Sequence, residues 1–323
     1  MRSKVNITIP TYNRDYCLEK AIKGALSQSY DHTTVTVIDD GSSDESYKVA
    51  QIFFEIPNFC YVKLDKNVGT AQAKNFSLLC SDYDAITFHD SDDQPNEHKI
   101  LMQVRALNMA GHQADPILNW DTMGKQNGRQ MRVDIVVGAH KMIKLDGSIH
   151  VMNKRISLVD DFFPTLQFPS KTEGDWILIN SGLFRKNVFT EVGGFLDSVE
   201  EDRELRNRTI GCGYLYYFLE EPLLTKIEMD DSLTVSEDTN YIATRRIKDR
   251  EEAWRRNKFF MQNDDKNDLI KKVRIEIDLS QIKINFISNP SLLTFNEQIP
   301  CTEATAELFY PFKQQKADKT YKS

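Results

Sequence analysis

Two acidic residues separated by one position could hold a metal ion. Asp90 and Asp92 flank Ser91, and in a turn both carboxylates can approach one cation. Hard oxygen ligands suit Mg²⁺ or Mn²⁺, which commonly keep several waters and also bind a diphosphate. The run Asp-Ser-Asp-Asp could equally be a solvated turn whose aspartates cap a helix, because so short an acidic motif is a weak signal. Taken alone, the motif supports both interpretations equally.

A second acidic pair, Asp39-Asp40, precedes Gly41 and Ser42. Ser42 with Glu45 three residues later matches a capping box, so a helix is predicted to begin there. A turn with a helix cap explains Ser42, but it does not explain two adjacent aspartates directly after an apolar run. These carboxylates could accept hydrogen bonds from a base or a ribose.

A third pair, Glu201-Asp202, stands at the start of a predicted helix. Acids in the first turn of a helix stabilise it by about 0.3–1 kcal/mol, and spacing alone favours this structural role. A carboxylate within hydrogen-bond reach of an attacking hydroxyl can instead accept its proton.

Short apolar runs alternate with helix-period segments up to about residue 110. Strands are predicted at 5–9, 35–38, 61–64 and 85–88, and helices around 18–26, from 42, over 70–79 and around 100–107. This alternation predicts an α/β fold with a Rossmann-like, mostly parallel sheet and helices on both faces. Ligands of such folds bind beyond the carboxyl ends of the strands. The polar clusters 11–14, 39–43 and 89–93 all follow strands, so we expect them to converge on one edge.

The later elements follow less regular patterns. A hairpin is predicted from 133–144 and 149–152 around Asp146-Gly147. Helices are predicted over 184–192, over 200–210 with Gly211 at its C-terminal end, and over 244–261. Strands are predicted at 176–179, at 214–219 and within 273–286. Residues 273–312 are expected to form an extra element that covers a sheet edge or holds a partner subunit.

The composition is that of an ordinary soluble globular chain. The 323 residues are 40% hydrophobic and 28% charged, which excludes disordered and collagenous classes. A net charge of −7 provides no global basic field for nucleic acid. No apolar stretch approaches the ~20 residues of a membrane span. Five cysteines without a CxxC pair favour a reducing compartment. We therefore expect a cytoplasmic protein, with peripheral contact at the inner face of the membrane left open.

Five segments in order resemble the motifs of family 2 glycosyltransferases with the A-type fold. They are VNITIPTYNR, VTVIDDGSSDES, KNVGTAQAKNFSL, DAITFHDSDD and EVGGFLDSVEEDRELRNRTIGCGYLYY, within residues 4–225. Each motif alone is weak, whereas five in the right order are a strong signal. The resemblance implies transfer of a sugar from a nucleotide diphosphate donor, with UDP the commonest nucleotide. It also implies inversion at the anomeric carbon and a glycan or lipid-linked acceptor, often in surface polysaccharide synthesis.

The resemblance also assigns roles to individual residues. Its donor-binding positions are Thr11, Tyr12, Arg14, Asp39, Asp40, Lys74, Asp90, Ser91 and Asp92. Asp90 and Asp92 match the metal-binding DxD motif for Mn²⁺ or Mg²⁺, with Asp92 the better ligand. Asp202 matches the catalytic base, and Glu201 of the same acidic pair lies on the acceptor side. His89 departs from the family, where an aliphatic residue is more usual, and is interpreted as a packing feature.

Several alternatives remain open. The segment 245–250 is interpreted as a solvated helix, or as a loop whose arginine closes over the donor diphosphate, or as a membrane-surface contact. Trp176, with Asn153 and Asn180, could contact an acceptor sugar or belong to the core. The functional division is predicted as a nucleotide-sugar-binding half (1–110), an acceptor-binding half (111–240) and a C-terminal extension (241–323).

Two other functions compete with transfer. The first is a catalytically silent glycan-binding or scaffold module, against which the intact aspartates argue. The second is a sugar-phosphate nucleotidyltransferase, which needs a glycine-rich loop after the first strand. Residues 10–14 contain no glycine, so this reading ranks low.

Overall fold

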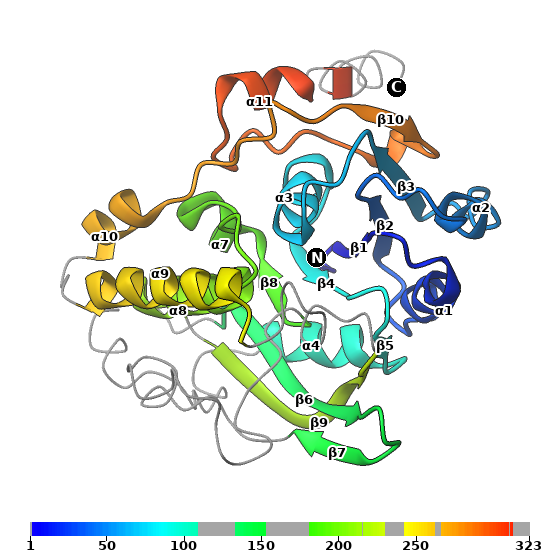
Figure 1. The fold of residues 1–323 in the computed structure, drawn as a ribbon, viewed down its shortest axis with the longest axis horizontal. Coiled ribbons are helices and arrows are strands. Elements are labelled where there is room, and N and C mark those ends of the chain that lie inside the picture. The colour runs from blue at the N-terminus through cyan, green and yellow to red at the C-terminus, as the bar shows by residue number, and fades with distance from the viewer. Residues whose placement is uncertain are drawn as a thin grey trace. The chain divides into compact units, whose positions relative to one another are not determined.

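The computed structural model describes residues 2–108, 133–152, 181–214, 216–229, 242–261, 266–309 and 311–312 (Figure 1). The chain forms two compact units. The N-terminal unit comprises residues 1–92, 185–197 and 274–323, and the central unit comprises residues 93–184 and 198–273. The functional division predicted above, with boundaries near residues 110 and 240, stays a prediction.

The N-terminal unit is built on a parallel sheet with one antiparallel edge. Its described strands follow the order β10-β3-β2-β1-β4. They are β1 (Val5–Thr11), β2 (Thr33–Asp39), β3 (Phe59–Leu64), β4 (Ala85–Phe88) and β10 (Ile284–Ile287). Strand β1 lies parallel to β2 and β4, and β2 lies parallel to β3. All residues of β1 and β2 are buried, because helices cover both faces of these strands.

The helices of this unit connect its strands. Helices α1 (Asp15–Leu26) and α2 (Ser46–Gln51) contact each other, and α3 (Thr70–Cys80) lies on the opposite side of β1 and β2 from α1 (Figure 1). Helix α1 buries Leu18, Ala21, Ile22 and Ala25, one face of a helix with a period of 3.6. The later segments add α7 (Lys186–Val192), a 3₁₀ turn over Pro290–Leu292 and α11 (Glu303–Leu308).

The C-terminal segment completes the outer edge of this sheet. Strand β10 pairs antiparallel with β3, and Phe286 packs its ring within 5.2 Å of Tyr47 and 5.5 Å of Phe54, centroid to centroid. Further along, the Asn296 amide donates to the carbonyls of Leu78 and Ser81 at 2.7 and 2.5 Å. Residues 273–312 thus include an element that covers a sheet edge, one of the two roles expected for them.

The central unit contains a second group of strands. Strand β6 (Ile135–Ile143) lies parallel to β9 (Tyr216–Ile227) and antiparallel to β7 (Ile149–Met152). The first residues of β8 (Leu183–Arg185) pair with β6, and the short β5 (Gln94–Pro95) pairs with β9. Its described helices are α4 (Lys99–Leu107), α8 (Glu201–Gly211), α9 (Thr244–Met261) and α10 (Lys266–Val273).

The predicted α/β class, with a mostly parallel sheet and helices on both faces, is confirmed. The four early strands, the hairpin around Asp146-Gly147 and helix α9 form where the sequence predicted them. The predicted strand at 176–179 lies outside the described residues. Within the described part of the chain, no helix is both long and apolar enough to cross a membrane.

Some local predictions are wrong. Helix α2 begins at Ser46 rather than at Ser42, because the Ser42 hydroxyl accepts a hydrogen bond from the Asn13 amide instead of capping a helix. The residue with positive φ after α8 is Gly213, whereas Gly211 is still helical. Helices α10 and α11 were not predicted, and of the strands expected within 273–286 only β10 forms, from residue 284.

Candidate active site

Three polar clusters meet at the carboxyl ends of β1, β2 and β4. Thr11 and Asp39 are partners in the parallel register, and the Asp40 amide donates to the Thr11 carbonyl at 2.8 Å. The His89 amide donates to the Thr8 carbonyl at 2.8 Å, which places the residues after β4 beside the same strand. The convergence predicted for residues 11–14, 39–43 and 89–93 is therefore found for the residues of these clusters that belong to the N-terminal unit, which ends at Asp92.

The Thr11 side chain contributes an uncompensated polar group at this edge. Its hydroxyl is buried and has no hydrogen-bond partner within the described residues. Buried polar groups are normally hydrogen-bonded, so an orphan hydroxyl at the end of a central strand calls for an explanation.

Asp39 anchors the turn after β2 from within the core. Its side chain is fully buried, and it accepts hydrogen bonds from the Tyr61 hydroxyl and from the Ser42 amide, the latter at 2.7 Å. The Lys63 ammonium lies 3.9 Å from the same carboxylate. Burial, followed by the neighbouring Asp39 carboxylate, raises the pKa of Tyr61 and keeps this phenol a hydrogen-bond donor.

Asp40 ties this turn to the segment before α3. Its two carboxylate oxygens accept hydrogen bonds from the amides of Val68 and Gly69, at 2.7 and 2.8 Å. Burial raises the pKa of Asp40 to about 6, although the two amide hydrogen bonds act in the opposite direction. Asp40 is therefore a carboxyl group that changes charge close to neutral pH.

The turn itself requires glycine at position 41. Gly41 has a φ of +74°, and a Cβ built there would lie 2.5 Å from the carbonyl carbon of Lys66. Next to it, Asn13 joins the first loop to the second. Its backbone amide donates to the Ser42 hydroxyl, and its side-chain oxygen accepts from the Ser43 backbone amide, both at 2.9 Å. Side-chain bonds to backbone groups thus fix the two loops against each other.

Tyr12 and Arg14 lie on the outer side of the first loop. Tyr12 is 45% exposed, and Tyr16 one turn later is 56% exposed. The Arg14 guanidinium donates to the Tyr16 hydroxyl, and its central carbon lies 5.8 Å from the centroid of that ring. An exposed aromatic ring at this edge can stack on a nucleobase, an interaction worth about 1–3 kcal/mol.

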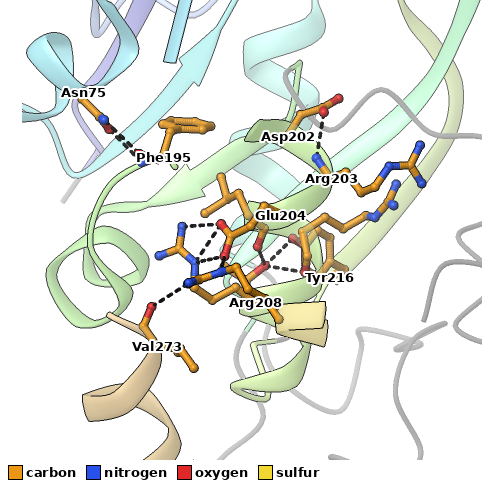
Figure 2. Close-up of polar contacts among 12 residues, drawn as sticks. Asn75, Phe195, Asp202, Arg203, Glu204, Arg208, Tyr216 and Val273 are labelled. Atoms are coloured by element: carbon orange, nitrogen blue, oxygen red, sulfur yellow. Dashed lines mark hydrogen bonds and ion pairs between the residues drawn. The ribbon is translucent and has the colours of Figure 1, made fainter. Parts of the chain in front are cut away.

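Lys74 lies one turn into α3 and is fully buried. Its ammonium lies 5.9 Å from the ring centroid of Phe88, at the end of β4, and 5.3 Å from that of Phe195. Phe195 is held by Asn75, whose amide oxygen accepts from its backbone amide at 2.7 Å and whose amide nitrogen donates to its carbonyl at 3.0 Å (Figure 2). Phe195 and Asn75 lie inside the motifs quoted above, but no local pattern of residues indicates that they contact each other.

Asp90 and Asp92 occupy the turn that follows β4. Both side chains are partly exposed, whereas Ser91 and Asp93 between and beside them are buried. Within the described residues, no three His, Cys, Asp or Glu side chains gather into a metal-binding group. Two partly exposed carboxylates fit a hard cation that takes its remaining ligands from a diphosphate and water. His89, predicted to be a packing feature, is 1% exposed.

The acceptor-side residues belong to the central unit. Glu201 is buried and Asp202 is partly exposed at the start of α8, where the Asp202 carboxylate accepts from the Arg203 amide at 2.7 Å (Figure 2). Trp176, Asn153 and Asn180 lie outside the described residues. The placement of the acceptor sugar by these residues stays a prediction.

Buried ion pairs run along α8. Glu204 and Arg208 are both fully buried, with an Nη2–Oε2 distance of 3.0 Å, and Arg256 of α9 donates to Glu204 at 2.9 Å (Figure 2). Arg246 and Arg250 contact Glu200, so the interpretation of 245–250 as a solvated helix holds for Arg245 and Lys248 but is wrong for these two arginines.

Comparison with known proteins agrees with this arrangement. Residues 6–161 match the glycosyl transferase family 2. Glycosyltransferase GlyG of Streptococcus pneumoniae serotype 4 is 32% identical over 201 residues, which are 59% of this chain and 60% of GlyG. The GalNAc(5)-diNAcBac-PP-undecaprenol beta-1,3-glucosyltransferase of Campylobacter jejuni is 33% identical over 93 residues, 28% of this chain and 30% of that protein. This chain thus spans about 60% or less of the length of these relatives.

Solved structures show the same fold. TarS of S. aureus (residues 1–349), in complex with UDP, aligns with a TM-score of 0.56 at 14% identity, covering 84% of this chain and 69% of that one. The same protein with UDP-GlcNAc gives a TM-score of 0.56 at 15% identity, covering 84% and 70%. Residues 6–161, just under half of this chain, and the motifs that end its parallel strands are similar to the family 2 glycosyltransferases.

Proposed function

We propose that this protein is an inverting, metal-dependent glycosyltransferase that moves a sugar from a nucleotide diphosphate donor to a hydroxyl group. The observation that carries the proposal is the convergence of Thr11, Asp39, Asp40 and the Asp90–Asp92 turn at the carboxyl ends of adjacent parallel strands. Open α/β sheets bind their ligands at this edge. The similarity of residues 6–161 to glycosyl transferase family 2 supports a sugar-transfer chemistry at the same edge.

The donor nucleotide is proposed to be UDP. Support comes from TarS, which shares the fold and was solved with UDP and with UDP-GlcNAc. In this chain, the exposed ring of Tyr12 offers a stacking surface, and the orphan hydroxyl of Thr11 offers a hydrogen bond. Asp40 holds the segment before α3, so it shapes the edge at which a base and ribose would bind.

Asp90 and Asp92 are proposed to hold Mn²⁺ or Mg²⁺, with Asp92 the better ligand. Their two carboxylates are partly exposed in a turn and are hard oxygen donors. A bound divalent cation supplies Lewis-acid stabilisation for the negative charge that develops on the departing nucleoside diphosphate. Lys74, whose Nζ lies 5.9 Å from the ring centroid of Phe88 at the end of β4 and 5.3 Å from that of Phe195, is proposed to face the base or the phosphates of the donor.

Asp202 is proposed to be the catalytic base. The acceptor hydroxyl must lose a proton as its oxygen attacks the anomeric carbon, and a carboxylate within hydrogen-bond reach accepts it. A single displacement inverts the anomeric carbon and needs only this one carboxylate. Asp202 is partly exposed at the start of α8, and one of its oxygens accepts the Arg203 amide. Glu201 and Trp176 are assigned to the acceptor side.

The acceptor is proposed to be a glycan or lipid-linked saccharide in polysaccharide synthesis. The name of the C. jejuni relative describes an acceptor linked to undecaprenol through a diphosphate. An acceptor of this kind would place the enzyme in the cytoplasm, in peripheral contact with the inner face of the membrane.

Thermal unfolding tests the proposed donor site. We expect UDP or UDP-GlcNAc together with Mn²⁺ to raise the melting temperature more than nucleotide or metal alone, because both bind only the folded state. Asp92→Asn should abolish the extra shift caused by Mn²⁺. The matched control is Asp31→Asn, at an exposed aspartate that pairs with Arg2. If no uridine, guanosine or thymidine diphosphate or its sugars shifts the wild type, the proposal is wrong.

Turnover tests the proposed base. Asp202→Asn should abolish UDP release from the donor while leaving the thermal shift by UDP and Mn²⁺ nearly intact. Normal turnover by this variant would refute the assignment. Binding of UDP-sugars without any UDP release by the wild type would favour a silent binding module instead, and pyrophosphate release from a nucleoside triphosphate would favour a nucleotidyltransferase.

A further inference from the structure

The start of α8 is held by a cluster of charged side chains that the proposed chemistry does not use. This cluster, called the ionic hub below, consists of Glu200, Arg203, Arg246, Asp249 and Arg250. Glu200 is the residue before α8, and its carbonyl accepts the Glu204 amide at 3.0 Å, the first hydrogen bond of the helix. The side chain of Glu200 is almost completely buried. Asp202 follows two residues later, so any movement of Glu200 moves the proposed base.

Three arginines converge on the Glu200 carboxylate. Arg203 donates to Oε2 at 2.6 Å, whereas Arg246 and Arg250 of α9 both donate to Oε1, at 3.1 and 3.4 Å. Charge-assisted hydrogen bonds of this kind are about twice as strong as neutral ones. Two of the three come from α9, so the carboxylate joins two helices.

A second contact from α9 binds the same short segment, Val199-Glu200. Asp249 accepts a hydrogen bond from the Val199 backbone amide at 2.9 Å. Positions 246, 249 and 250 are spaced i, i+3 and i+4, so they lie on one face of α9. One turn of α9 therefore holds both residues that precede α8.

The consecutive carboxylates Glu200, Glu201 and Asp202 would repel one another if all three faced the same way. The arginines draw Glu200 towards α9, while Asp202 stays partly exposed. We infer that Glu200 and Asp249 are positioning residues that set the location of Asp202 for proton transfer. This inference rests on the proposed function, in which Asp202 is the base.

The test compares variants of this hub with a control on the same helix. Glu200→Gln removes the charge that compensates three arginines. Asp249→Ala removes the acceptor of the Val199 amide, and Asp249→Asn restores an acceptor oxygen without the charge. Glu252→Gln is the matched control, because Glu252 pairs with Arg255 on the exposed side of α9.

The activity readout is UDP release from UDP-GlcNAc with Mn²⁺, measured at a temperature at which every variant is folded by circular dichroism. Misplacement of a catalytic group by ~1 Å costs roughly 100-fold in rate. We expect kcat to fall about 10- to 100-fold in Glu200→Gln and about 10-fold in Asp249→Ala, with the donor KM unchanged within about twofold. Asp249→Asn should recover most of the rate, and Glu252→Gln should match the wild type.

Hydrogen exchange of the segment 198–206, followed by mass spectrometry, gives a readout independent of turnover. Exchange should accelerate there in Glu200→Gln and Asp249→Ala but not in Glu252→Gln. Unchanged kcat in a folded Asp249→Ala, or unchanged exchange of 198–206 in both hub variants, would overturn the inference. If the wild type releases no UDP, or Asp202→Asn is fully active, the proposed function fails instead, and exchange alone then decides whether α9 fixes the start of α8.

Discussion

Replacing Glu204 by glutamine should strongly destabilise the protein. Glu204 and Arg208 are both fully buried, and the guanidinium of Arg208 donates to both carboxylate oxygens from Nε at 3.1 Å. Arg256 adds a contact from α9 at 2.9 Å. The variant keeps the size of the side chain but leaves two guanidinium groups facing a neutral amide.

The size of the effect follows from these distances. Two unit charges about 3 Å apart attract each other by roughly 5–6 kcal/mol at an effective dielectric constant of ~20. Much of this attraction offsets the cost of removing both ions from water, so the intact pair adds little net stability. Removing one partner leaves that cost uncompensated, and typically destabilises by about 3–5 kcal/mol. For chains of this size that corresponds to a fall of roughly 10 °C in melting temperature.

Differential scanning calorimetry of the wild type and of two variants provides the measurement. The control is Glu252→Gln, which removes an ion pair of similar length between exposed side chains, with Nη2 of Arg255 at 2.6 Å from Oε1. Exposed pairs contribute about 0–1 kcal/mol, so this variant should shift the melting temperature by no more than about 2 °C. Equal shifts in both variants would refute the reasoning that burial makes the Glu204 pair costly to break.

Two further predictions concern the N-terminal unit. The pKa of Asp40 is about 6 in the folded chain and 3.8 in its unperturbed state, so between these values the folded state binds more protons than the unfolded state. This carboxyl group should therefore lower the free energy of unfolding by up to about 3 kcal/mol as the pH rises from about 4 to 6. The unfolding free energy of the wild type minus that of Asp40→Asn should therefore fall over this range and level off above it, and a constant difference would contradict the assignment. Gly193→Ala should be far more destabilising than Gly147→Ala, since both glycines have a φ of +79° but only at Gly193 would a Cβ collide with backbone, 1.8 Å from the Ile275 carbonyl oxygen. Similar melting temperatures of these two variants would show that the 274–277 segment moves away at little cost.

The sequence predicts the regular part of the fold because its signals are local. Short β-branched runs such as Val35–Ile38 become buried parallel strands, and α1 and α3 form where apolar residues recur with helical spacing. Ser42 shows where reasoning from local sequence fails. Its spacing to Glu45 fits a helix cap, but its hydroxyl oxygen instead accepts a hydrogen bond from the backbone amide of Asn13, in another loop.

The candidate site can be predicted only in part from the sequence. Motif positions predict Asp39, Asp40 and Lys74 as site residues, but they do not indicate which side chains contact them. Tyr61 lies on the next strand, and Phe195 is 120 residues away from Asn75, which binds it. No local pattern links such partners, because only the tertiary fold brings them together. The same is true of Glu200, whose arginine partners at 246 and 250 belong to a helix that reads as solvated from its composition.

Strand β10 also determines when the N-terminal sheet can be finished. Its backbone pairs with β3, and the Lys283 amide binds Asp65 across a sequence separation of 218 residues. A ribosome releases the early strands long before it releases residues 284–287. During that interval the β3 edge exposes unpaired backbone groups, the condition under which strands of different chains join. Synthesis therefore leaves the sheet of the N-terminal unit open along this side until residues 284–287 have been made and can pair with β3.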